Sequence, residues 1–190
     1  REACREAASW PNPLSISVNL SPVDFRRGDI AALLLSTLLE TGLDPQRLEV
    51  EITEGVLIDD FDRAIATLRR IKNLGVRVAI DDFGTGFSVL SHLKSLPVDV
   101  LKIDRGFVAD LGSNTNDLAI VRAVIALAEA FELELVAEGV ETRAAAMTLL
   151  RHGCHRAQGF LLSPALDGDD MASLLAKGRV PVHFSATPTL

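Results

Sequence analysis

Leu48-Glu49-Val50-Glu51-Ile52 alternates apolar and acidic residues over five consecutive positions. Because successive side chains of a β-strand point to opposite faces, this stretch predicts a strand with one apolar and one acidic face. The central strands of an open parallel sheet are usually apolar on both faces, since helices cover both. The acidic face therefore indicates different surroundings, and other segments of the chain share the pattern.

Short β-rich runs alternate with helical patterns along the chain, which predicts an α/β fold with a mainly parallel sheet. The candidate strands are Leu14–Leu20, Leu48–Ile52, Val76–Ile80, Val100–Ile103, Glu134–Ala137 and Ala157–Leu161. The candidate helices are Ile30–Thr41, Phe61–Leu74, Ser88–Ser95, Asn116–Phe131, Arg143–His152 and Met171–Lys177.

The polar side of these strands decides between an open doubly wound sheet and a closed barrel. Ser17 and Asn19 lie on that side of the first strand, Lys102 lies there on the fourth, and Glu134 on the fifth. A wall with helices on one face and a polar interior on the other is typical of a barrel. We therefore expect a closed (β/α) barrel whose functional site lies where the strands end.

Composition favours one globular domain, because 48% of the 190 residues are hydrophobic. No apolar run reaches the roughly 20 residues of a membrane span, so we expect a cytoplasmic domain without membrane contact. A net charge of −7 without any basic stripe argues against a nucleic-acid polymer as partner. Cys4 and Cys154 match no metal or redox spacing and are expected to be ordinary thiols. We predict a domain over residues 1–178 and an extended tail over 179–190.

Polar residues recur at or near the ends of the candidate strands, and parallel strands deliver their ends to one rim of a barrel. Each of them alone could be a solvated strand end or a helix N-cap. Together they predict a site. They are Asn19, Glu51, Asp81, Asp82, Lys102, Asp104, Glu138 and Gln158.

Five of these side chains are carboxylates, and carboxylates that share a cleft cannot all ionise cheaply. Divalent cations would resolve the repulsion, and oxygen ligands suit Mg²⁺, Mn²⁺ or Ca²⁺ better than Zn²⁺. The adjacent Asp81 and Asp82 suit two neighbouring metals, which can together activate a water and stabilise the leaving oxygen of a phosphodiester. Lys102 could orient that water, or it could be a structural partner of a carboxylate.

The stretch from Asp81 to Ser88 predicts a strand, a glycine loop and the start of a helix. Gly84 and Gly86 permit a tight turn, and the N-terminus of the helix could receive a phosphate. The loop lacks the Gly-Lys-Ser/Thr ending of a P-loop.

Six motifs in order resemble the EAL domain family over about residues 4 to 175. They are Val18-Asn19-Leu20-Ser21, Glu51-Ile52-Thr53-Glu54, Asp81-Asp82-Phe83-Gly84-Thr85-Gly86, Leu101-Lys102-Ile103-Asp104, Ala137-Glu138-Gly139-Val140-Glu141-Thr142 and Gln158-Gly159-Phe160. The resemblance implies a TIM-like barrel, often dimeric, that hydrolyses cyclic di-GMP to linear pGpG with two Mg²⁺ or Mn²⁺ ions and is inhibited by Ca²⁺.

The resemblance also implies a role for each matching residue. Asn19, Glu51 and Asp81 would hold one metal, and Asp81 would bridge to a second metal held with Asp82 and Glu138. Lys102 would hold the attacking water, with Glu138 as a candidate general base. Asp104, Glu141 and Gln158 would support the site. Glu54 would tether the loop that contains Gly84 and Gly86.

The family's Glu-x-Leu-x-Arg motif is absent from this sequence. We expect it, with the first one or two strands, to lie before Arg1, and we expect residues 1–190 alone to be a poor enzyme. A sensory or GGDEF-type domain could also precede it. Two other functions stay open: a catalytically silent cyclic di-GMP receptor and an interaction domain that ignores the nucleotide.

Overall fold

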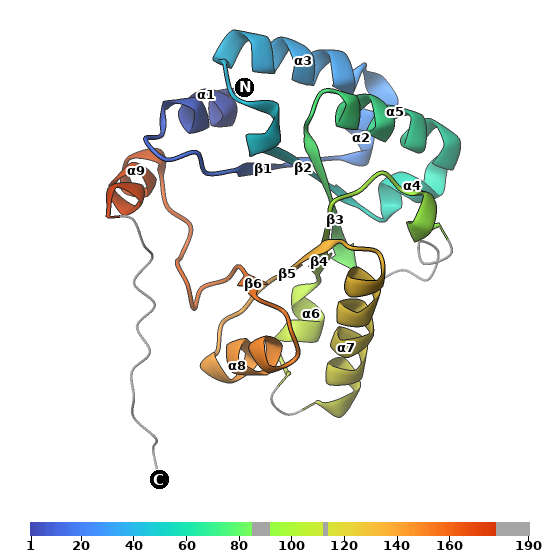
Figure 1. Ribbon diagram of the computed structural model, residues 1–190, viewed down its shortest axis with the longest axis vertical. Helices are drawn as coiled ribbons and strands as arrows, with labels where there is room; N and C mark the ends of the chain where they lie inside the picture. The colour runs from blue at the N-terminus through green and yellow to red at the C-terminus, as the bar shows by residue number, and fades with distance from the viewer. Residues whose placement is uncertain (85–91, 112–113, 178–190) are drawn as a thin grey trace.

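The computed structural model describes residues 1–84, 92–111 and 114–177. Its strands form one parallel sheet whose spatial order follows the sequence. Figure 1 shows this sheet curled into an arc. The strands are β1 (Ile16–Leu20), β2 (Leu48–Thr53), β3 (Arg77–Phe83), β4 (Val100–Ile103), β5 (Glu134–Ala137) and β6 (Arg156–Ala157). The curled parallel sheet is part of a TIM-like barrel and confirms the expected fold class.

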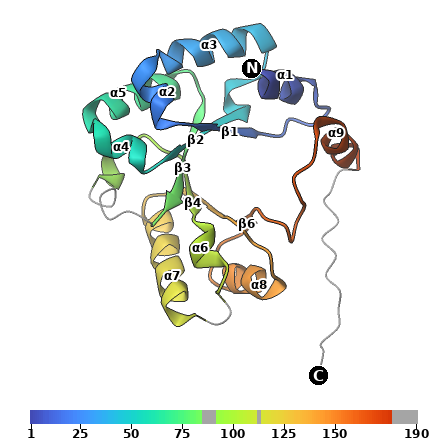
Figure 2. The same ribbon diagram turned by 180° about the vertical axis from the view of Figure 1, so that it is seen from behind.

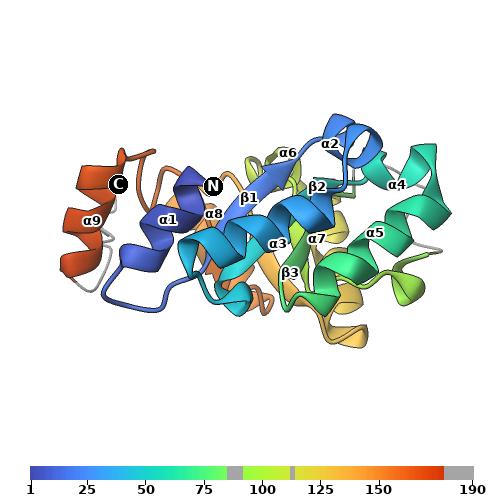
Figure 3. The same ribbon diagram turned by 90° about the horizontal axis from the view of Figure 1, so that it is seen from above.

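Helices cover the outside of the arc. Figures 1 and 2 show α3 and α5 along one half of it and α7 and α8 along the other. Figure 3 shows α9 beside α1, where a Cβ atom added at Gly168 would lie 4.0 Å from the carboxyl group of Glu6. The helices are α1 (Glu2–Ser9), α2 (Pro22–Arg27), α3 (Ile30–Thr41), α4 (Gly55–Asp59), α5 (Phe61–Asn73), α6 (Arg105–Val108), α7 (Thr115–Ala130), α8 (Arg143–Arg151) and α9 (Gly168–Ala176).

The sequence analysis missed the short helices α1, α2, α4 and α6, because few residues give little hydrophobic periodicity. Their local signals are nevertheless present. In α2 the Ser21 hydroxyl accepts from the Asp24 amide, and the Asp24 carboxylate accepts from the Ser21 amide. Pro22 occupies the first turn, where its missing N–H costs nothing.

Several expected boundaries were wrong. The first strand begins at Ile16 rather than Leu14, and the third runs on to Phe83. The last strand pairs only over Arg156–Ala157, because the chain then turns at Gly159. A Cβ atom on Gly159 would lie 2.4 Å from the backbone of Val140.

Two further expectations reach residues that the structure does not describe. The helix expected over Ser88–Ser95 is seen only as the 3-10 turn Leu93–Ser95, and residues 88–91 lie outside the described part. The tail expected over residues 179–190 also lies outside it.

The apolar side of the strands forms the core with the helices, as the alternation predicted. Val50, Ile52, Ile80 and Leu101 are completely buried. Cys4 and Cys154 are separate buried thiols, which confirms the expectation for them. In the described part of the chain, no helix is long and apolar enough to cross a bilayer.

The polar side of the strands carries a row of ion pairs near the strand starts. Arg77 of β3 contacts Glu49 of β2 at 3.3 Å and reaches past β4 to Glu134 of β5 at 2.6 Å. Glu49 also accepts from Ser17 of β1, and Glu134 contacts Arg156 of β6. The row therefore links five strands beneath the rim.

Arg77→Met should destabilise the protein by about 1–3 kcal/mol, because it leaves Glu49 and Glu134 partly buried without their shared partner. The hydrogen bond from Arg77 lowers the pKa of Glu134. The ion pair therefore contributes fully to the free energy of unfolding above the ordinary pKa range of glutamate, and this contribution is lost as the pH falls through the lowered pKa of Glu134.

Urea unfolding of wild type and Arg77→Met between pH 3 and pH 7 measures this contribution. Arg122→Met, which replaces an exposed residue of α7, is the control. The difference in unfolding free energy between wild type and Arg77→Met should be largest at pH 7 and shrink in acid. A difference below 0.5 kcal/mol at pH 7, on the order of a neutral surface substitution, would contradict the role of the row.

Candidate functional site

The ends of the strands bring the predicted polar residues to one rim. Asn19 of β1 lies opposite Glu51 of β2, and Asp81 of β3 lies opposite Thr53 of β2. Lys102 of β4 lies opposite Val136 of β5, two residues before Glu138. Because side chains two residues apart on a strand share a face, these pairings place the polar groups on the lumen side.

Lys102 lies at the centre of this rim and is 3% exposed. Its Nζ atom is 2.7 Å from Glu51 Oε2, 3.3 Å from Asp81 Oδ1 and 2.5 Å from Glu138 Oε1. Burial alone would lower the pKa of Lys102, but hydrogen bonds with Glu138 and Glu51 outweigh it and raise the pKa above its ordinary value. Lys102 is therefore a buried cation shared by three strands.

Asp81 and Asp82 are adjacent, and in a regular strand their side chains would point to opposite faces. The pairing of β3 with β4 shifts register between Ile80 and Phe83, and Asp82 adopts a left-handed φ of 53°. As a result, carboxylate oxygens of Asp81, Asp82 and Glu138 all lie within 4.8 Å of one another. The irregularity turns two neighbouring residues into one acidic cluster.

The repulsion within this cluster affects the pKa of Asp82. Burial, the charge of Asp81 and a hydrogen bond with Asp104 raise the pKa of Asp82. Asp104 also caps α6 by accepting from the Gly106 amide at 2.9 Å. It therefore combines the capping role and the site position that the sequence left open.

Glu138 accepts from two neighbours, Lys102 and Gln158. Gln158 Nε2 donates to Glu138 Oε1 at 2.6 Å, and the Gln158 amide donates to the Ala137 carbonyl at 2.8 Å. Burial raises the pKa of Glu138, with Asp81 and Glu51 adding to the effect and Lys102 opposing it. A carboxylate with a raised pKa is a better proton acceptor at neutral pH than an ordinary glutamate.

Glu54 follows β2 and is 5% exposed. Its Oε1 atom accepts from the Gly84 amide at 3.0 Å, just after the acidic pair of β3. Gly84 has a φ of 101°, and a Cβ atom there would lie 3.1 Å from the ring of Phe107. Gly86, the second glycine of the predicted loop, lies outside the described residues.

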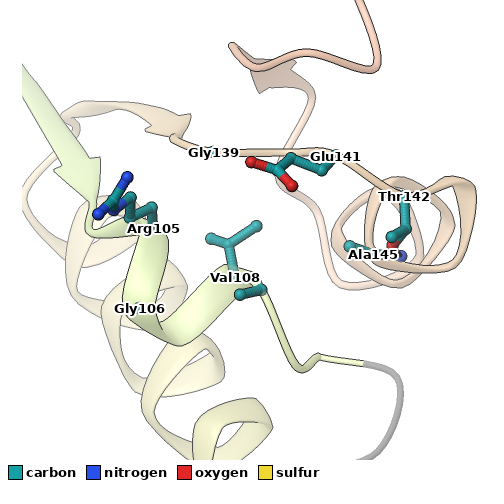
Figure 4. A pocket seen from close by; sticks show the side chains of 8 residues that line it. Arg105, Gly106, Val108, Gly139, Glu141, Thr142 and Ala145 are labelled. Atoms are coloured by element: carbon teal, nitrogen blue, oxygen red, sulfur yellow. Dashed lines mark hydrogen bonds between the residues drawn. The ribbon is translucent and has the colours of Figure 1, made fainter.

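Two predicted residues, Asn19 and Glu141, lie outside the acidic cluster. Asn19 is exposed at the end of β1. Glu141 is exposed and lines a pocket of about 240 Å³ between α6 and the start of α8. Figure 4 shows the Glu141 carboxylate pointing toward Gly139, along the loop that joins Gly139 to α8.

Arg105, which the sequence analysis did not select, lines the same pocket. Its position directly after the predicted site residue Asp104 is the feature of the sequence that could have identified it.

The donor set fits a hard divalent cation. Asp81, Asp82 and Glu138 supply carboxylate oxygens close enough for one ion, and Glu51 adds another carboxylate that is joined to two of them through Lys102. Mg²⁺ and Mn²⁺ prefer such oxygen ligands, whereas the cluster offers no thiolate or imidazole for Zn²⁺.

Solved structures share this architecture. The crystal structure of the EAL domain of Mycobacterium smegmatis DcpA is 56% identical, covers 95% of this chain and 83% of that chain, and superposes with a TM-score of 0.89. The Pseudomonas aeruginosa MucR phosphodiesterase in complex with c-di-GMP is 40% identical, with a TM-score of 0.85 over 90% of this chain and 70% of that chain. A manganese and cyclic di-GMP complex of Klebsiella pneumoniae BlrP1 is 34% identical, with a TM-score of 0.79 over 85% and 42%.

The family model described as the EAL domain matches residues 1–165. Curated relatives from Mycobacterium tuberculosis and Mycobacterium bovis are 46% identical over 95% of this chain, and the chain spans 30% of their length. The matched family model covers both the arc of strands and the acidic cluster, and it agrees with the resemblance that the six motifs predicted. This chain belongs to the EAL domain family.

Proposed function

We propose that this chain is the catalytic part of a cyclic di-GMP phosphodiesterase that forms linear pGpG with two Mg²⁺ or Mn²⁺ ions. The observation that carries the proposal is the joint position of Asp81, Asp82 and Glu138 within one 4.8 Å cluster, with Lys102 in contact with two of them. The MucR and BlrP1 structures, which are complexes with cyclic di-GMP, support this choice of substrate.

Charge balance supports two ions rather than one. Five carboxylates, when ionised, carry five negative charges, and Lys102 carries one positive charge, which leaves four negative charges at the rim. Two divalent cations balance that charge. The five carboxylates are those of Glu51, Asp81, Asp82, Asp104 and Glu138.

In the proposed assignment Asn19, Glu51 and Asp81 would hold one ion, and Asp81, Asp82 and Glu138 would hold the other. When bound, the ions would activate the attacking water and stabilise the leaving oxygen. The manganese in the BlrP1 structure supports Mn²⁺ as a candidate. Inhibition by Ca²⁺ stays a prediction.

The chain's own residues would accept the proton, orient the water and support the substrate. One water would add across one phosphodiester link: a new P–O bond would form, the P–O bond to the ribose 3′ oxygen would break, and the proton taken from the water would be returned to that oxygen. Glu138 would accept the proton of the water, held in place by Gln158. Lys102 would orient the water next to Glu138, and Glu141 would support the substrate from the adjoining pocket.

The partners beyond the substrate follow from relatives and stay predictions. MucR is named a bifunctional diguanylate cyclase and cyclic di-GMP phosphodiesterase, which supports a cyclase-type domain elsewhere in the full-length protein. A homodimer and a cytoplasmic location are expected on the same family basis.

The direct test is to incubate the full-length protein with cyclic di-GMP and Mn²⁺ and to separate the products by chromatography. We expect pGpG to accumulate, and EDTA to stop its formation. Nucleotide binding without turnover by metal-replete, folded protein would favour the receptor, and neither binding nor turnover would favour the interaction domain.

Glu138→Gln should lower kcat by roughly 10²–10⁴-fold, because the amide cannot accept the proton. Binding of cyclic di-GMP, measured by calorimetry, should survive because the amide keeps the shape of the side chain. Glu129→Gln, on the exposed end of α7, is the matched control and should retain wild-type kcat. A Glu138→Gln protein with unchanged kcat would remove Glu138 from the chemistry.

Glu54→Ala should weaken Mn²⁺ binding roughly 10-fold, because the segment that follows Asp81 and Asp82 loses its anchor at Gly84. Glu54→Gln keeps a carbonyl oxygen that can accept from the Gly84 amide and should weaken binding less. Calorimetry with Mn²⁺ measures both variants. Equal affinities for wild type and Glu54→Ala would rule out the tether.

A further inference from the structure

Lys102 occupies a position that resembles a cation site. A lysine ammonium has three N–H donors, and Lys102 Nζ has three carboxylate oxygens within 3.3 Å, one from β2, one from β3 and one from the residue that follows β5. These oxygens belong to Glu51, Asp81 and Glu138. Every donor of a 3% exposed ammonium is therefore matched by an anionic acceptor.

The same carboxylates take part in the acidic cluster. Asp81 and Glu138 contact Lys102, and both also contribute to the cluster that includes Asp82. A divalent cation bound by Asp81, Asp82 and Glu138 would therefore lie close to the ammonium. Two like charges repel strongly in a buried site, where water screens them little.

We propose that Lys102 is an internal counter-ion that competes with the divalent cation for Asp81 and Glu138. The ammonium neutralises part of the acidic rim and joins three strands, and a metal gains those carboxylates only by weakening their contacts with it. Lys102 thus lowers the affinity of the site for metal, in addition to any part it plays at the water. This inference rests on the metal site of the proposed function.

Competition of this kind predicts that removing the ammonium raises the affinity of the site for metal. Without the ammonium, Glu51, Asp81 and Glu138 repel one another until a cation arrives, so the protein should gain more from metal binding. Lys102→Met should therefore bind Mn²⁺ at least 10-fold more tightly than wild type in calorimetry. Its Tm should fall in EDTA, and its rise in Tm on adding Mn²⁺ should exceed that of wild type.

Lys72→Met is the matched control. Lys72 also forms an ion pair, with Asp99 at 2.6 Å, but at the opposite end of the sheet, where Asp99 accepts from the Val78 amide. Its loss should lower Tm in EDTA while leaving the Mn²⁺ affinity within twofold of wild type. This separates a general loss of stability from competition at the rim.

Lys102→Gln covers the case in which Lys102→Met does not fold in EDTA, because the amide can still donate to two carboxylates. It should also bind Mn²⁺ more tightly than wild type. Mn²⁺ affinity equal to or weaker than wild type in both variants would overturn the proposal and make Lys102 a structural or water-orienting residue only. If wild type itself binds no Mn²⁺, the proposed function fails instead.

Discussion

The buried contact of Lys102 with Glu51, Asp81 and Glu138 is the interaction on which the rim of this barrel depends. Parallel strands deliver their ends to one place, so acidic residues at those ends are forced together whether or not they attract one another. The Lys102 ammonium compensates part of that repulsion, and its hydrogen bonds with Glu138 and Glu51 raise the pKa of Lys102. The remaining negative charge is what would attract divalent cations in the proposed function.

The fold prepares this rim on two levels. Beneath it, Arg77 joins Glu49 and Glu134, so that β2, β3 and β5 are linked near their starts by one charged group. At the rim itself, the register shift of β3 and the left-handed backbone of Asp82 bring both aspartates of the pair to Glu138. A slip of β3 against its neighbours would break both arrangements at once, because each requires the same alignment of strands.

The sequence was sufficient for what depends on periodicity. Alternation along Leu48–Ile52 predicted the polar lumen, and the position of Lys102 on its strand predicted its presence at the rim. It was insufficient for irregular backbone. Nothing in Asp81-Asp82 itself specifies a shift of register, and nothing in Gly159 specifies how early the last strand ends. The bridge from Arg77 to Glu134 spans 57 positions and passes over β4, so it required the folded sheet. The contact between Glu54 and Gly84 was expected only from the family resemblance, since an acidic residue after a strand usually forms surface contacts.

The central claim is that this rim binds two divalent cations through carboxylates that also hold Lys102. Anomalous diffraction from crystals of the full-length protein grown with Mn²⁺ tests it most directly, because manganese scatters anomalously and lysine does not. Two peaks are predicted, one among Asp81, Asp82 and Glu138 and one among Asn19, Glu51 and Asp81. Well-ordered crystals that show no peak within coordination distance of these side chains would contradict the account.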